Sequence, residues 1–222
     1  MSASGLTYLQ IINRVLSRLR EATVAANNTT TYSTFIGTLV NQVKAEIEDA
    51  FHWNSMRDTY SVTTVVDTAS YTLTGAGMNA VVLDGWNTTT SQRLTKGTNA
   101  DFNSKFFGVT SVQTGTVTEY LPAGVNANYD LKIDVWPKPN AVEALKFNLY
   151  VPQTDLSSDS TVPLVPQSVL IEEVIARAMA ERGDEGAPQP APGETFIRKE
   201  LLASAISREQ EHDSTELDWY PE

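Results

Sequence analysis

Apolar positions recur at helical spacing near both ends of the chain and alternate with polar ones in between. Steps of three and four residues predict helices over residues 7–21, 34–51, 166–182 and 194–210. Ser33 is the expected N-cap of the second of these helices. Proline opens the third helix and glycine follows it, which is the usual order at the two ends of a helix.

The middle of the chain has the period of two that is typical of strands. Glycines and short polar runs separate the alternating segments, and this pattern favours an antiparallel sandwich or a small barrel. A short helix is expected over 98–107, with Asn99 as its cap. The predicted strands cover residues 58–66, 71–73, 80–86, 115–121, 129–136 and 145–151.

The order helix–sheet–helix predicts an α+β fold. A lone helical hairpin would leave an apolar stripe in water, so the N- and C-terminal helices are expected to form one helical bundle, with the sheet inserted between them. The predicted domains are a bundle from 1–57 and 152–210, and a β domain over 58–151. Residues 211–222 are predicted to form an extended C-terminal tail.

Composition narrows the function classes. The 222 residues are 41% apolar and 19% charged, with a net charge of −11 and no cysteine. The acidic charge argues against specific or non-specific nucleic-acid binding, because cations must replace counterions along the phosphates. The missing cysteines exclude disulfides and thiolate metal sites. No stretch has the length of a membrane span, and the first residues do not have the pattern of a signal peptide, so neither a membrane nor export is expected.

Candidate catalytic groups are few. His52 and His212 are the only histidines, and both are interpreted as packing or surface residues. Glu46 and Glu48 are two positions apart on one predicted helix, so they should diverge instead of facing one cleft. Asp84, with the glycine after it, is interpreted as a strand-end turn, although a calcium site there remains the alternative. We therefore expect no enzyme, no catalytic residue, no cofactor and no metal.

The C-terminal tail has the composition of an interaction segment. Trp219 and Tyr220 stand among carboxylates and are the best candidates for anchors in a pocket of a partner. Leu217 in the tail and Phe196 in the last predicted helix complete the predicted interface. The alternative is a tail that folds back on its own chain or stays disordered.

Three stretches, with their order and spacing, carry a resemblance to a known family. Each stretch has aromatic residues or prolines at the end of a predicted helix or strand. With their spacing, the three stretches span about residues 6–210. On these residues the chain resembles the tail-adaptor family of tailed bacteriophages, the head-to-tail connector proteins also called tail tubular protein A. The stretches are 49–57 (DAFHWNSMR) leading into 60–65 (YSVTTV), 131–139 (LKIDVWPKP), and 162–166 (VPLVP), which opens the helix that runs through 179–184 (MAERGD).

The resemblance implies a structural role in the virion. Such adaptors form a ring of about twelve copies under the portal and leave a channel for DNA. The helical bundle would dock against the portal protein and neighbouring copies, and the β domain would point toward the next tail component, such as a nozzle or tail-tube protein. The protein would be assembled in the host cytoplasm and reside in the neck or tail of the particle.

Two other function classes remain open from the sequence. The first is a carbohydrate- or receptor-binding module of a virion or cell surface, in which Trp86 would stack on sugar rings. The second is a peptidoglycan hydrolase that uses helix carboxylates.

Overall fold

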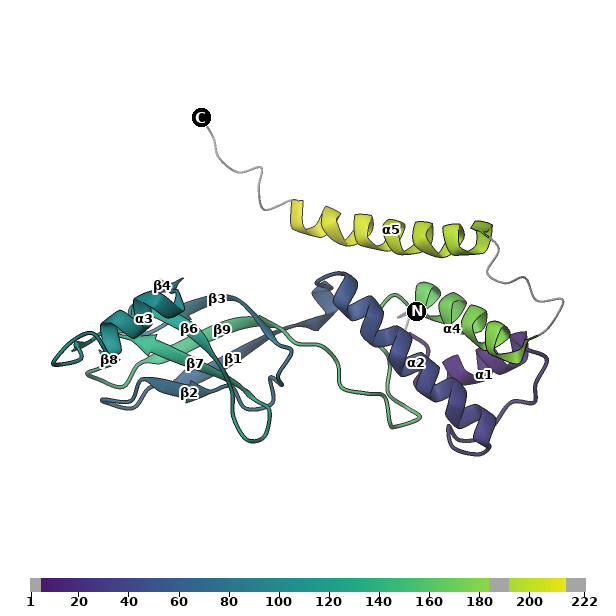
Figure 1. Cartoon of the computed structure of the whole chain (residues 1–222), viewed down its shortest axis with the longest axis horizontal. Coiled ribbons are helices and arrows are strands. Elements are labelled where there is room, and N and C mark those ends of the chain that lie inside the picture. Colours follow the sequence, from purple (N-terminus) through teal and green to yellow (C-terminus); the bar gives the residue numbers. More distant parts are fainter. Residues whose placement is uncertain (1–4, 184–191, 215–222) are drawn as a thin grey trace. The chain divides into compact units, whose positions relative to one another are not determined.

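The computed structural model describes residues 5–183 and 192–214 and divides into two compact units. The helical unit comprises Met1–Ser55 and Gln153–Glu222, and the β unit comprises Met56–Pro152 (Figure 1). The fold is therefore α+β, as predicted. The helices are α1 (Tyr8–Arg18), α2 (Thr31–Ala50), α3 (Asn99–Phe106), α4 (Gln167–Arg182) and α5 (Pro192–Ser214), with a 3-10 turn η1 (Asn54–Met56).

Side-chain caps set the starts of α1 and α2. The Thr7 hydroxyl accepts a hydrogen bond from the amide of Gln10, and the side-chain oxygen of Gln10 accepts one from the amide of Thr7. Thr30 and Ser33 form the same reciprocal pair at α2. The prediction that Ser33 caps α2 was therefore wrong: Thr30 is the N-cap, and Ser33 lies three residues inside, where its hydroxyl completes the capping box.

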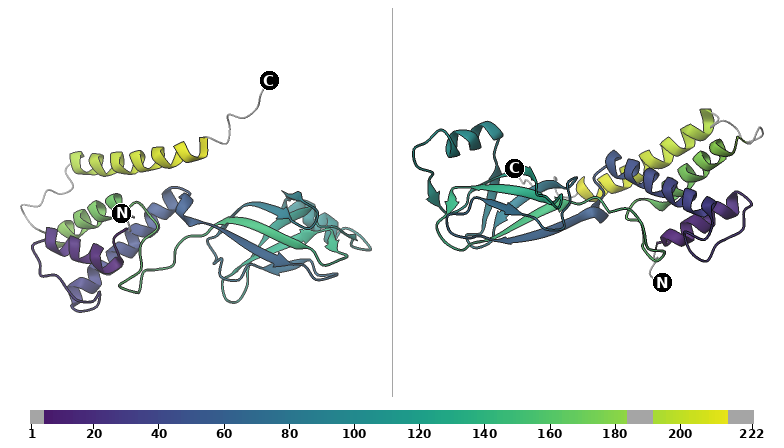
Figure 2. Two further views of the ribbon diagram at one scale, coloured as in Figure 1. Left: turned by 180° about the vertical axis from the view of Figure 1, so that it is seen from behind. Right: turned by 60° about the horizontal axis from the view of Figure 1, so that its bottom comes forward.

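Helices from both ends of the sequence pack together in the helical unit (Figure 2). α4 contacts α2, α1 and α5, and Gly183 ends α4 in the left-handed conformation that glycine adopts without strain. The extended segment 153–165 lies along these helices, where Asn41 exchanges two hydrogen bonds with the backbone of Leu156. Most of the buried apolar residues of this unit come from three helices, among them Ile11, Ile12, Val15 and Leu16; Ile36, Val40, Val43 and Ile47; Leu170, Val174, Ile175 and Ala178.

The β unit is a nearly closed seven-stranded sheet in the order β1-β9-β3-β4-β6-β7-β2. It is mixed, because β4 pairs in parallel with β6, whereas a purely antiparallel sheet was predicted. The chain between these two strands contains α3, and a parallel pair needs a crossover of this kind. The strands are β1 (Arg57–Thr63), β2 (Ser70–Thr72), β3 (Val81–Asn87), β4 (Gln92–Lys96), β5 (Thr114–Gly115), β6 (Glu119–Val125), β7 (Leu131–Trp136), β8 (Lys138–Pro139) and β9 (Ala144–Tyr150).

Two local predictions in the β unit need correction. β4 was not predicted, because Leu94 is its single buried apolar residue and gives no clear alternation. α3 is capped by Thr98, whose hydroxyl accepts from the amide of Asp101, and Asn99 is already inside the helix. In both places the residues are mostly polar, and the hydrophobic pattern alone neither reveals a strand there nor shows which of two polar residues caps the helix.

The core of the β unit is one cluster of side chains that face the inside of the sheet. Phe147 and Tyr120 meet edge to face, with ring centroids 5.5 Å apart. A buried carboxylate, Glu143, accepts hydrogen bonds from the side-chain amide of Asn87 at 2.7 Å and the backbone amide of Val117 at 3.1 Å. This network joins three parts of the unit that are far apart in sequence.

Candidate functional site

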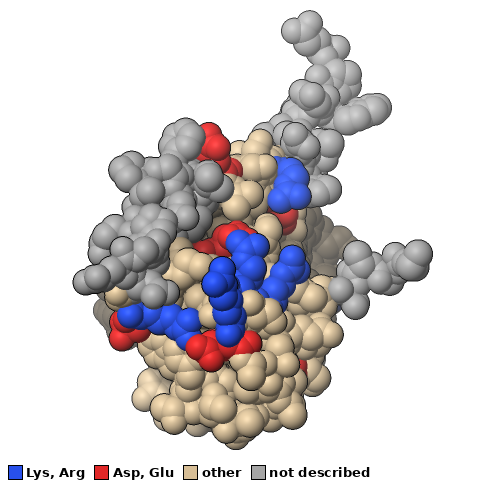
Figure 3. Space-filling view, turned by 90° about the vertical axis from the view of Figure 1, so that its right-hand side faces the viewer, with Lys and Arg blue, Asp and Glu red and all other residues tan. Residues whose placement is uncertain are grey.

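Charged side chains gather on the helical unit in a mixed pattern. On the face that Figure 3 shows, basic side chains lie side by side with acidic ones between them. Arg182 pairs with Glu21, and Arg177 pairs with Glu46 and Glu173. The pairs of Arg182 with Glu21 and of Arg177 with Glu46 join residues from the two sequence segments of the unit, whereas Glu173 and Arg177 lie on the same helix.

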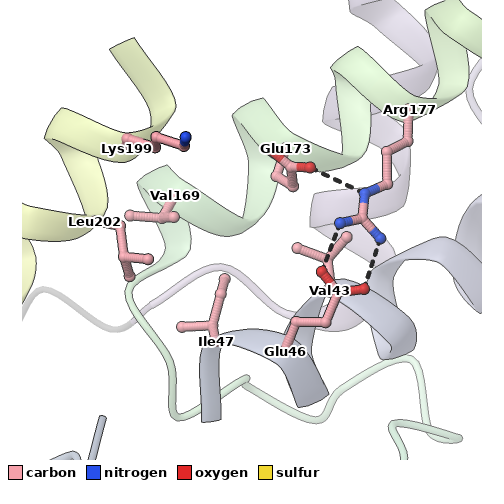
Figure 4. A pocket seen from close by; sticks show the side chains of 8 residues that line it. All are labelled: Val43, Glu46, Ile47, Val169, Glu173, Arg177, Lys199 and Leu202. Atoms are coloured by element: carbon pink, nitrogen blue, oxygen red, sulfur yellow. Dashed lines mark hydrogen bonds and ion pairs between the residues drawn. The ribbon is translucent and has the colours of Figure 1, made fainter. Parts of the chain in front are cut away.

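A groove lies between α2, α4 and α5 in the helical unit (Figure 4). It has a volume of about 280 Å³. Four side chains make its walls apolar, and four charged ones line its rim, a composition that suits an interaction surface. The apolar residues are Val43, Ile47, Val169 and Leu202, and the charged ones are Glu46, Glu173, Arg177 and Lys199.

Arg177 organises the rim of this groove. Its Nη1 and Nη2 donate to the two carboxylate oxygens of Glu46 at 2.8 and 2.5 Å, while its Nε donates to Glu173 at 2.9 Å (Figure 4). The bidentate bonds from Arg177 lower the pKa of Glu46, and the same bonds raise the pKa of Arg177. Both groups therefore stay charged, and Glu46 is a poor source of a proton.

A buried ion pair lies on the other side of α2. Lys44 Nζ donates to both oxygens of Glu48 at 3.1 Å and to the carbonyl oxygen of Gln153 at 2.5 Å. Burial raises the pKa of Glu48, and the hydrogen bonds from Lys44 oppose that shift. The pair fixes the start of the segment that returns from the β unit, because Gln153 also donates its amide to Glu48.

The structure separates the carboxylates that were weighed as a catalytic pair. Glu46 binds Arg177 at the groove, whereas Glu48 binds Lys44 in the interior. His52 is exposed, while its neighbour Trp53 is buried and donates its indole N–H to the carbonyl of Ile47. His212 belongs to α5, but its side chain is outside the described residues.

The predicted interface residues are largely beyond the described part of the chain. Leu217, Trp219 and Tyr220 lie outside it, and Phe196 belongs to α5 with a side chain that is not described. Their role stays a prediction. Sequence reasoning missed Arg177, although its position four residues after Glu173 on a predicted helix was a signal for an ion pair.

The β unit has an exposed apolar patch of its own, which we call the valine patch: Val65, Val66 and Val142. More than half of each side chain is exposed. Two hydrogen-bonded loops carry these valines, since the amide of Thr64 donates to the carbonyl of Glu143 at 2.8 Å and the amide of Asp67 to that of Pro139 at 2.9 Å. The patch is therefore presented on a braced backbone.

Trp86 is exposed on the outer face of the same sheet. It is 41% exposed and lies directly across from Arg93 on β4 and Lys146 on β9. An exposed indole between two cations is a further candidate for recognition.

The described residues contain neither a metal-binding cluster nor a membrane-spanning helix. Within residues 5–183 and 192–214, no three His, Asp or Glu side chains are grouped so that they could hold a metal ion. In that same part of the chain, no helix combines the length and the apolar character that a membrane span requires.

The fold and these surfaces define an α+β protein with candidate recognition surfaces on both of its units. The sequence profile of the SU10 adaptor protein family matches residues 6–217, and the chain belongs to this family of phage structural proteins. This confirms the resemblance to phage adaptors. The chain is therefore a structural adaptor of the virion that interacts with other virion components. No curated protein sequence matches it.

Proposed function

We propose that this adaptor forms a ring beneath the portal and joins the phage head to the tail, leaving a channel for DNA. The main support for this proposal is the family match, because it covers residues of both the helical unit and the β unit. Closed rotational symmetry lets identical chains bury the same surfaces repeatedly, and a ring of about twelve copies would match a portal.

The β unit offers a surface for the next tail component, a nozzle or tail-tube protein. The chain enters and leaves this unit at the same end of β1 and β9, where Arg57 is paired with Tyr150. At the other end of these strands Thr63 is paired with Ala144, and the valine patch follows directly. The patch thus lies at the end of these strands that is remote from the chain crossing, and it is free for a second partner.

The helical unit offers the complementary surface for the portal and for neighbouring copies. Its groove has apolar walls and a rim on which Arg177 holds the carboxylates in place. The predicted anchors Trp219 and Tyr220 belong to the same unit in sequence. Aromatic anchors and ordered rim charges are the usual components of a protein interface.

DNA would pass this protein without binding to it. The net charge of −11 repels phosphates and provides few cations to replace their counterions. A gel-shift assay at physiological salt should therefore show no retardation of duplex DNA. Tight duplex binding would contradict the proposed role as a passive wall.

We also propose that the protein acts without catalysis. Glycoside hydrolysis needs a carboxylic acid with a raised pKa beside a second carboxylate, whereas Arg177 lowers the pKa of Glu46. Purified protein should leave cell walls intact. Lysis that disappears in Glu46→Gln would overturn this proposal.

A glycan- or receptor-binding module is the second candidate, and the exposed Trp86 favours it. A glycan array with wild-type protein and Trp86→Ala separates the two functions. Specific glycan binding that depends on Trp86, without any binding to portal, would favour the module.

The proposed ring is tested by mass measurement with purified portal and tail components. Wild-type protein should bind the portal in about the copy number of a ring. Val142→Asp should keep this binding and lose the next tail component, because it puts a charge in the valine patch. Asn128→Asp, an exposed residue of the loop between β6 and β7, adds the same charge and should retain both partners.

A further inference from the structure

The charge of the helical unit is divided between its two ends in sequence. Residues 5–20 contain Arg14, Arg18 and Arg20 and no acidic residue. The last eight residues, 215–222 (TELDWYPE), contain three acids and no base, together with Leu217, Trp219 and Tyr220. A basic segment and an acidic aromatic segment of one chain are complementary in charge.

Three exposed arginines of α1 and of the turn that follows it form a surface that we call the arginine face: Arg14, Arg18 and Arg20. Arg14 and Arg18 are four residues apart, so they lie on the same side of the helix. Among the described residues, Arg14 and Arg20 have no ion-pair partner. Arg18 Nη2 is 3.9 Å from Glu172, and both side chains are largely exposed, so this pair is weak and easily exchanged.

A groove adjoins the arginine face and supplies apolar surface. It has a volume of about 410 Å³, large enough for a bulky side chain. Gln167 fixes one edge, because its side chain hydrogen-bonds both the amide and the carbonyl of Leu6 at 2.8 and 2.9 Å. Arg14 lines this groove, and a guanidinium group can stack on an aromatic ring. The lining residues are Gly5, Leu6, Arg14, Gln167, Ser168, Ile171 and Glu172.

The direction of α5 carries its end away from the arginine face of the same chain. α5 runs antiparallel to α4, as both views show, and Leu202 lines a groove with Val169 near the start of α4 (Figures 1 and 2). Ser214 is twelve residues further on, about 18 Å along the helix axis. The bond from the amide of Asn54, after α2, to the carboxylate of Glu209 agrees with this direction.

α1 runs in the same direction as α4, so Arg14 lies near the start of α4 and Arg20 lies toward its end. Leu6 contacts Gln167 at the start of α4, and the carbonyl of Leu19 accepts from Arg182 at its end. Val169 and Arg182 are about 20 Å apart along the axis of α4. Added to the 18 Å between Leu202 and Ser214, this distance places Arg20 nearly 40 Å from Ser214 along the axis. Eight extended residues span at most about 28 Å. The tail of the same chain is therefore too short to reach Arg20, and it would have to turn back along α5 by about 18 Å to meet Arg14 and the groove.

We propose that residues 215–222 of one copy dock on the arginine face and adjoining groove of the next copy. The carboxylates of Glu216 and Asp218 pair with Arg14 and Arg18, and Trp219 enters the groove beside Leu6. Because the tail and the face are different surfaces, the contact is head-to-tail and generates a ring when the rotation closes. This last step rests on the ring of the proposed function.

A charge-swap experiment in the full-length chain tests the contact. Arg14→Glu with Arg18→Glu should raise the concentration needed for assembly at least tenfold, and so should Glu216→Lys with Asp218→Lys. The four changes together in one chain, and an equimolar mixture of the two double variants, should restore assembly, because each tail again meets an opposite charge. Lys96→Glu with Lys132→Glu, on β4 and β7, is the matched control and should assemble like wild type.

The outcomes distinguish this contact from the proposed function. If wild type assembles and either double variant does the same, or if the combined charges fail to restore assembly, the tail contact is wrong while the ring stands. If wild type stays monomeric even with portal, the ring is wrong. A labelled peptide of residues 209–222 then decides the contact: binding that Arg14→Glu with Arg18→Glu weakens supports it, and no binding overturns it.

Discussion

The β unit and the helical unit differ in how their cores are assembled from the sequence and in how much charge they have. The β unit is one continuous stretch, Met56–Pro152, with seven basic and eight acidic residues. The helical unit joins Met1–Ser55 to Gln153–Glu222 and has nine basic and nineteen acidic residues. One unit is nearly neutral and closed on itself, while the other depends on contacts between distant segments and carries most of the charge.

This difference separates stability from recognition. A sheet that is nearly closed leaves few strand edges, so it can present loops such as those of the valine patch without losing its core. The helical unit keeps exposed charges and grooves between helices, which are the features that a partner can use. Substitutions in the two units should therefore have different consequences.

Loss of the buried carboxylate in the helical unit should give the largest effect. Glu48→Ala leaves Lys44, which is only 1% exposed, without its charged partner, at a cost of about 3–5 kcal/mol. Hydrogen exchange should show α2 and α4 unprotected while the strands stay protected. The double variant Lys44→Met with Glu48→Leu should recover much of the loss. Equal protection in Glu48→Ala would contradict the assigned role of the pair.

A cavity in the sheet should produce the opposite pattern. Phe147→Ala removes a ring that is 1% exposed and packs against Tyr120, which costs about 3–5 kcal/mol. Amides of β3 and β9 should exchange faster, and those of α2 should not. Lys146→Ala, the exposed neighbour on the same strand, is the control with little expected effect. Simultaneous loss of both units would show that they unfold as one.

The buried polar network of the β unit should have an intermediate effect. Glu143→Gln keeps the size of the side chain but places an amide among two N–H donors, from Asn87 and Val117. An unmatched donor there costs about 1–3 kcal/mol. Chemical denaturation followed by tryptophan fluorescence should detect this, whereas Asp58→Asn on exposed β1 should leave the midpoint unchanged. An unchanged denaturation midpoint for Glu143→Gln would mean that the hydrogen bonds of Glu143 do not stabilise the β unit.

The ion pair at the groove should contribute least, and its contribution should depend on pH. The folded-state pKa of Glu46 lies below its ordinary value of 4.5, so the stability it provides is present above that value and is lost as the pH falls through the lowered pKa. Because both side chains are partly exposed, Glu46→Gln should cost at most about 1 kcal/mol at neutral pH. Melting curves between pH 3 and 7 should converge at the acid end. Glu181→Gln, exposed on α4, should match wild type throughout.

Much of the fold was predictable because strong apolar periods dominate its main elements. The pattern located α1, α2, α4 and α5 and most strands to within a few residues. The parallel pair of β4 and β6 was not predictable, because β4 offers one buried apolar side chain and pairing direction leaves no local trace. The Thr30 cap was missed for a similar reason, since Thr30 and Ser33 are chemically equivalent candidates.

The candidate surfaces were less accessible from sequence than the fold. Arg177 was recognisable as a partner of Glu173 by spacing, but its bonds to Glu46 join residues 131 positions apart. The valine patch depends on two distant loops that lie together only in the folded sheet. Family resemblance, in contrast, was readable from short stretches, and the match over residues 6–217 confirmed it.

A mass measurement on a mixture of this protein and the portal tests the proposed placement most directly. Native mass spectrometry or mass photometry of the purified mixture should show one portal carrying about twelve copies of the adaptor. Such a complex is the predicted result. A chain that stays monomeric and leaves the mass of the portal unchanged would contradict its placement beneath the portal.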